Sequence, residues 1–270
     1  MERNIYWLPS DFVNELTTPG LDTMAGPVPL SQYLCLNPKN GGNARINELL
    51  GALRGSRIRD DQSGLSIDQT VGSTELDLLW KGQGTPDAFV AMMDFLCENQ
   101  DQLKSAPGVL GRVYATYFRD YADANALKKM VADKYFGIDC IGFVANYLRD
   151  VRLWDKYYGY EIDQWDRVFT QNVRKPTDVK PLQLIVWPGS HVALIDWVWN
   201  KDDSQVDVDV CQSSSGGPQC NAHVTLKLAG GQLVKGYTPF SIAGGTPTLP
   251  VTGTCYVMSW PGLQYGDFTP

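Results

Sequence analysis

The chain has 270 residues, which is enough for one large hydrophobic core or for two smaller domains. Its 43% apolar and 20% charged residues are ordinary for a soluble globular protein. The net charge of −7, without a basic stripe, argues against a nucleic-acid partner, and no apolar run approaches the length of a membrane span.

The N-terminal sequence Met-Glu-Arg-Asn-Ile-Tyr-Trp lacks a basic segment followed by an apolar one. We therefore expect no cleavable secretion signal. The protein is then expected either to stay in the cytosol or to leave it by a signal-independent route.

The six cysteines show no paired Cys-x-x-Cys spacing, and the chain has only two histidines. These counts argue against a structural zinc site, and the sequence indicates no metal and no other cofactor. Cys211 and Cys220 flank a polar loop. Either they close it with a disulfide, which implies an oxidising destination, or they are two ordinary thiols.

The first half of the chain is predicted to be mainly helical. Residues 1–43 are rich in Pro, Gly and Asn and are expected to form loops and short elements. Helices are predicted over 44–54, over 85–104 with Thr85 as cap and Pro86 in the first turn, and over 110–121 and 122–134. No role can be assigned to residues 1–109, which are expected to form a separate N-terminal region.

The second half is predicted to consist of strands. The expected strands cover 182–187, 191–200, 205–212, 224–228, 237–242 and 255–260. Helices followed by an antiparallel sheet are typical of an α+β architecture.

A short segment between the two halves carries the candidate nucleophile. Asp139 is placed as an N-cap, and Cys140 follows in the first turn of a helix with its apolar stripe at Phe143, Val144 and Tyr147. Free amides and the helix dipole favour a thiolate there, so we expect a depressed thiol pKa and a nucleophile. The alternative is a small buried residue at a helix start.

The hairpin after residue 190 supplies a candidate base. With a four-residue turn at 201–204, Ala193 faces Gln212 and His191 faces Ser214, so His191 and Gln212 are diagonal neighbours roughly 7–8 Å apart. His191 can then act as the base and Gln212 can orient it. The alternative is a structural histidine.

Two alternatives to this site remain open. A register slip by one residue would bring Asp209 and Cys211 beside His191 instead of Gln212. His223 is the rival base, but it follows a polar loop without a matching strand context.

Three segments together resemble the NlpC-type cell-wall peptidases, a group of papain-like cysteine hydrolases related to the CHAP amidases. They are Asp139-Cys140-Ile141-Gly142-Phe143-Val144, then 180–184, then His191-Val192-Ala193-Leu194, with Gln212 at the position of the third polar residue. Ile141 replaces the usual serine, and Leu182-Gln183 replace Gly-Asp.

The resemblance implies a papain-like core over residues 110–270. It also implies a thioester intermediate on Cys140, with His191 and Gln212 catalytic and Asp139 and Ser214 supporting. The substrate implied is a peptidoglycan stem peptide, cut by an endopeptidase or amidase. Because the chain is acidic and lacks a signal peptide, we expect an antibacterial effector delivered by a secretion machine, with an immunity protein as partner, or a phage lysis enzyme. The alternatives are a protein-directed deamidase, isopeptidase or acyltransferase with the same residues, and a non-catalytic binding module.

Overall fold

The computed structural model describes residues 7–34, 42–61, 63–153, 165, 169–245 and 253–260. Contacts divide the chain into two units. Unit 1 comprises residues 1–13, 143–214 and 219–270, and unit 2 comprises residues 14–142 and 215–218. Each unit is described separately below.

Unit 2 is built from helices and one small hairpin. Its two-stranded sheet pairs β1 with β2 in antiparallel register. Phe89 packs edge-on against Phe136 at a centroid distance of 6.4 Å, within a core of leucines, methionines and phenylalanines. Its elements are η1 (Leu16–Gly20), β1 (Leu21–Thr23), β2 (Gly26–Val28), α2 (Gly42–Gly55), η3 (Asp68–Gly72), α3 (Ser73–Leu79), α4 (Pro86–Glu98), α5 (Gln100–Ser105), α6 (Val109–Val113), η4 (Tyr114–Phe118) and α7 (Asp123–Ala132).

The predicted helices of this unit are confirmed in position, with two differences. The helix predicted over 110–121 is α-helical only to Val113, continues as the π-helix η4 and ends at Phe118. Thr85 caps α4 as expected, because its hydroxyl oxygen accepts a hydrogen bond from the Ala88 amide at 3.1 Å. The helix predicted to reach residue 104 is divided, because Asn99 leaves the helical conformation between α4 and α5. The Asn99 side chain donates to the Phe95 carbonyl oxygen, and that bond helps to end α4.

Helices α1 (Pro9–Glu15) and α8 (Cys140–Asp150) each run from one unit into the other along the chain. The apolar stripe predicted for α8 is confirmed, since Phe143, Val144 and Tyr147 are fully buried. Within unit 1, Phe12 of α1 contacts the rings of Phe143 and Tyr147. The segment of α8 beyond Gly142 is therefore fixed by aromatic packing.

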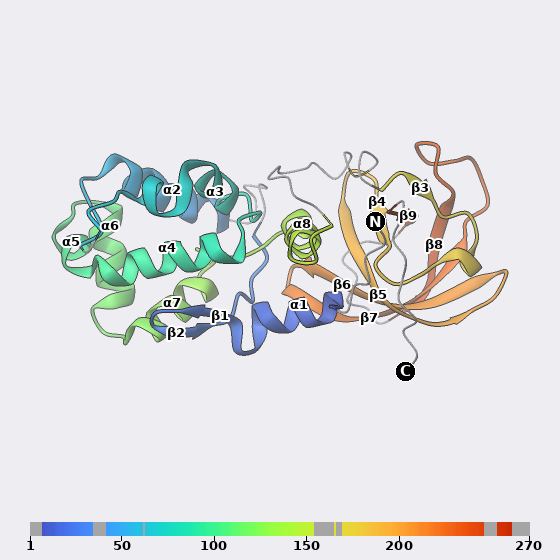
Figure 1. The fold of residues 1–270 in the computed structure, drawn as a ribbon, viewed down its shortest axis with the longest axis horizontal. Helices are drawn as coiled ribbons and strands as arrows, with labels where there is room; N and C mark the ends of the chain where they lie inside the picture. Colours follow the sequence, from blue (N-terminus) through green and yellow to red (C-terminus); the bar gives the residue numbers. More distant parts are fainter. Residues whose placement is uncertain are drawn as a thin grey trace. The chain divides into compact units, whose positions relative to one another are not determined.

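Unit 1 contains a closed barrel. Strands β9, β4, β5, β6, β7 and β8 pair in that order, all antiparallel where their register is defined, and β8 pairs again with β9. The short β3 adds to the outer edge of β9. Figure 1 shows these strands in yellow to red, curling into one sheet. The strands are β3 (Gln171–Asn172), β4 (Leu184–Trp187), β5 (His191–Lys201), β6 (Gln205–Ser214), β7 (Gly217–Leu228), β8 (Pro239–Gly245) and β9 (Thr254–Ser259). The short helix η6 (Pro176–Asp178) lies between β3 and β4 in the chain.

The predicted papain-like core, with helices packed on an open antiparallel sheet, is wrong. The pairing of Phe240 with Cys255 and of Pro239 with Tyr256 joins β8 to β9 and closes six strands into a barrel. Inward side chains such as Ile195, Val210 and Val257 then fill the interior. A closed sheet has no free edge, and its interior is filled by its own side chains rather than covered by helices.

The predicted hairpin register holds at Leu194 and Ile195, on the side of His191, and is lost toward the turn. Ile195 pairs with Val210 as expected, but a bulge follows, so that Trp197 faces Asp209 and not Val208. A second irregularity places Lys201 opposite Val206. Bulges insert an extra residue in one strand and shift the pairing that follows, so Trp197 does not face a valine across the hairpin.

Candidate functional site

The start of α8 is organised by Asp139, as its position in the sequence predicted. One carboxylate oxygen of Asp139 accepts a hydrogen bond from the Gly142 amide at 2.5 Å, the geometry of an N-cap. The other accepts from the Gln83 side-chain amide at 3.2 Å. Burial raises the pKa of Asp139 to about 7, although the Gly142, Gln83 and Ile141 hydrogen bonds act to lower it.

The segment Gly82-Gln83 forms the support for this helix start. The Asp139 amide donates to the Gly82 carbonyl oxygen at 2.8 Å. A Cβ atom on Gly142 would lie only 2.2 Å from that same oxygen, so the first turn of α8 approaches this backbone too closely for any larger residue. The side-chain oxygen of Gln83 is buried and has no hydrogen-bond partner among the described residues.

Sequence reasoning did not identify Gln83. The signal available was a glutamine between two glycines, directly before the Thr85 cap. That pattern indicates a turn but does not indicate that the glutamine is buried against a helix 56 residues further along.

Cys140 is the first residue of α8, and its relative exposure to solvent is only 3%. The other unbridged cysteines that the structure describes are Cys97 and Cys255. Burial raises the pKa of each of these two thiols to about 12, with further repulsion from nearby carboxylates at Cys97. They are therefore poor nucleophiles, and they serve as internal references for Cys140.

His191 and Gln212 are brought together by the barrel. The ring nitrogen Nε2 of His191 lies 2.6 Å from Oε1 of Gln212, and both side chains are buried. His191 is the first residue of β5 and pairs with Trp187 of β4, whose ring centroid is 5.6 Å away. The predicted diagonal arrangement of His191 and Gln212 is confirmed.

This hydrogen bond fixes the tautomer of His191. An amide oxygen can only accept, so Nε2 carries the proton and donates it to Gln212, which leaves the lone pair on Nδ1. Burial lowers the pKa of His191 to about 4, although the Gln212 hydrogen bond acts to raise it. The ring is therefore neutral at physiological pH, the form required of a proton acceptor.

Ser214 ends β6 and is buried, but its role as a support for His191 stays a prediction. The described contact of its hydroxyl is with Gln219, whose side-chain amide donates to it. Cys140 belongs to unit 2, whereas His191 and Gln212 belong to unit 1. Their catalytic pairing likewise stays a prediction.

His223, the rival base, lies within β7 and not after a loop as expected. Its Nδ1 forms an ion-pair contact of 2.8 Å with Asp209, and its side chain is half exposed. Asp209 also accepts a hydrogen bond from Trp199, which is 59% exposed. These contacts form a solvent-exposed cluster around His223, whereas His191 is buried.

Of the two possibilities for Cys211 and Cys220, the structure contains the disulfide. The polar segment between them is an extension of β6 and β7 joined by a tight turn, and not a loop. The bridge therefore links two adjacent strands of the barrel.

Comparisons with known proteins give no family for this chain. No family model, no curated protein and no solved structure matches it. The likeness to NlpC-type peptidases accordingly stays a prediction from short motifs. Within the described ranges, no helix combines the length and the apolar character needed to cross a membrane.

Proposed function

We propose that the chain is a thiol hydrolase that cleaves an amide bond, with Cys140 as nucleophile, His191 as base and Gln212 as the residue that orients the base. The observation that carries the proposal is the buried hydrogen bond of 2.6 Å between His191 and Gln212. A neutral imidazole held in one tautomer by an acceptor is the arrangement a proton-transferring base needs.

The proposed reaction begins with transfer of the Cys140 thiol proton to Nδ1 of His191. The sulfur attacks the amide carbonyl, the imidazolium protonates the leaving amine, and a thioester remains. Water then attacks the thioester while His191 accepts its proton, and that proton returns to the departing sulfur. Water is the only co-reactant, and the enzyme returns to its starting protonation state.

The helix start supports the electrophilic part of this reaction. Asp139 accepts from the Ile141 and Gly142 amides and so fixes the first turn of α8. We assign the Cys140 amide as one donor to the oxyanion, since it lies at the positive end of the helix dipole. The helix has 11 residues, which is long enough for that dipole to act.

The substrate class comes from the sequence resemblance, and a peptidoglycan stem peptide is the substrate we propose. A protein-directed deamidase or isopeptidase would use the same three residues on a different amide. The roles of Cys140, His191 and Gln212 and the identity of the substrate therefore need separate tests.

The chemical part is tested by competitive alkylation with iodoacetamide at neutral pH, read by peptide mass spectrometry. Cys140 should react at least about tenfold faster than Cys97 and Cys255, whose thiol pKa values are raised to about 12. His191→Ala should remove most of that advantage, whereas His223→Ala should leave it unchanged. Equal labelling of the three cysteines, or an advantage that survives His191→Ala, would refute the pairing.

A further inference from the structure

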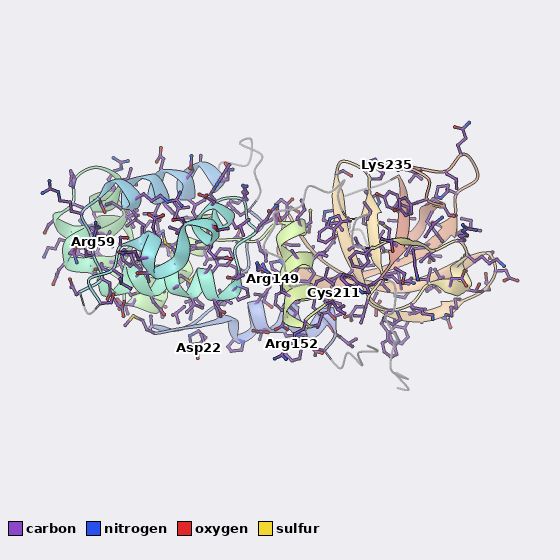
Figure 2. All side chains as sticks on the ribbon, turned by 45° about the horizontal axis from the view of Figure 1, so that its top comes forward. Asp22, Arg59, Arg149, Arg152, Cys211 and Lys235 are labelled. Atoms are coloured by element: carbon purple, nitrogen blue, oxygen red, sulfur yellow. A yellow bond between two sulfur atoms is a disulfide. The ribbon has the colours of Figure 1, made fainter. Side chains whose placement is uncertain are left out.

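Three side chains on neighbouring strands form a donor cluster that the proposed reaction does not use. Asp196 lies on β5, Cys211 on β6 and Cys220 on β7. One carboxylate oxygen and the two sulfur atoms all lie within 4.8 Å of one another. Figure 2 labels Cys211 among the barrel strands, where the two sulfurs are bridged.

The carboxylate of this cluster is half-buried, and no cation lies beside it among the described residues. One Asp196 oxygen accepts a hydrogen bond from the Ser10 amide at 2.8 Å. The carboxylates of Asp209 and Asp11 add further negative charge close to Asp196. In the part of the chain that the structure describes, no lysine, arginine or histidine forms an ion pair with Asp196. The local potential therefore favours a cation.

We propose that reduction of the Cys211–Cys220 bridge converts this cluster into a binding site for a thiophilic divalent cation such as Zn²⁺, with two thiolates and the Asp196 carboxylate as ligands. Thiolate and carboxylate ligands bind zinc at about 2.3 Å and about 2.0–2.2 Å, so three ligands around one ion lie within about 4 Å of each other. The bridged cluster already holds the three donor atoms within 4.8 Å of one another. Reduction frees the two sulfurs to separate to the distance that two ligands of one ion require, and water completes the fourth position.

The chemistry requires a reductant, and a small-molecule thiol supplies it. Two molecules of this thiol are oxidised to their own disulfide, while the Cys211–Cys220 bond breaks and each sulfur gains a proton. Binding of the cation then releases those two protons. A disulfide sulfur is not a thiolate, so the oxidised protein lacks two of the three ligands, and the redox state decides whether the site exists.

Sequence spacing did not indicate this site, because the three ligands come from three strands and the cysteines are nine residues apart. Only the antiparallel pairing of β5, β6 and β7 brings them together. The proposal is independent of the hydrolase proposal, and its test needs no substrate.

The test is a titration of the full-length Cys140→Ala chain with Co²⁺ or Cd²⁺ under anaerobic conditions, once reduced and once oxidised. The reduced chain should bind one ion with a thiolate-to-metal charge-transfer band. The oxidised chain, with identical sequence and fold, should show no band. Asp196→Asn should weaken binding by about tenfold or more, as loss of a ligand implies, while Asp207→Asn, which removes a neighbouring carboxylate bonded to Thr225, should leave it unchanged.

Several results would overturn the proposal. A reduced chain without a charge-transfer band would do so, and so would a band that persists in Cys211→Ser with Cys220→Ser, because the ion would then sit on other thiols. Unchanged affinity in Asp196→Asn would remove the carboxylate from the site. Circular dichroism of each reduced variant verifies that the barrel is intact when these comparisons are made.

Discussion

Nε2 of His191 lies 2.6 Å from Oε1 of Gln212, on adjacent strands of a closed barrel and away from solvent. This contact leaves only Nδ1 able to accept a proton. Gln212→Leu keeps the approximate volume but removes the acceptor, so the Nε2 proton is left buried without a partner. We expect a loss of about 1–3 kcal/mol in the free energy of unfolding.

The same variant should alter the tautomer of His191. Nitrogen-edited NMR should show the proton on Nε2 in the wild type and a mixture of tautomers in Gln212→Leu. Gln219→Leu is the matched control, because Gln219 lies on the same hairpin and bonds to Ser214 instead. A single unchanged tautomer in Gln212→Leu would show that the glutamine does not orient the ring.

Asp139 and His191 predict opposite dependences of stability on pH. The pKa of His191 is lowered from 6.5 to about 4, so between these values the unfolded chain binds the extra proton and stability rises with pH. The pKa of Asp139 is raised from 3.8 to about 7, so there the folded chain binds the extra proton and stability falls as pH rises. The two contributions largely cancel between pH 4 and 6.5.

Asp139→Asn removes one of these two contributions. Relative to the wild type, its free energy of unfolding should increase with pH by about 1 kcal/mol per pH unit over that window. Urea unfolding at several pH values measures the difference. Parallel pH curves for the two proteins would show that Asp139 does not titrate differently in the folded state.

Gly142 tests how closely the first turn of α8 lies on Gly82 and Gln83. An added Cβ would come within 2.2 Å of the Gly82 carbonyl oxygen and 2.8 Å of the Gln83 Cα atom, both of them backbone atoms. We expect Gly142→Ala to destabilise the protein by about 1–3 kcal/mol.

Gly51→Ala is the control for Gly142→Ala. Gly51 lies in α2 with open space around it, so alanine there should be neutral or should stabilise the protein by up to about 1 kcal/mol. Thermal melts of both variants decide the question. Equal melting temperatures would contradict the close approach at α8.

The Cys211–Cys220 bridge should contribute modestly to stability. It closes a loop with a sequence separation of nine, for which chain entropy gives about 2–3 kcal/mol as an upper value, since the hairpin already orders the loop. Urea unfolding with and without reductant measures this contribution. A chain that unfolds completely on reduction would contradict it.

Local patterns predicted much of the fold. A continuous apolar run located β4, and apolar patterns on both sides of a polar turn located β5 and β6. The Asp139 cap and the His191–Gln212 neighbours followed from helix and strand geometry. These features depend on residues close in the chain or across one short turn, where period and turn length determine position.

Long-range features were not predictable in the same way. Closure of the barrel depends on β8 meeting β9, and alternation of apolar residues does not specify which strand edges pair. The bulge after Ile195 left no local signal, and Trp199, predicted on the apolar face, is exposed. Gln83 reached Asp139 through tertiary packing alone.

The central claim, that Cys140 is the nucleophile of an amide hydrolase, is tested most directly by mass spectrometry of purified peptidoglycan stem peptides after incubation with the protein. The wild type and Cys97→Ala should cleave the peptides to the same product, and Cys140→Ala should leave them intact. Cleavage by Cys140→Ala at the wild-type rate would contradict the claim.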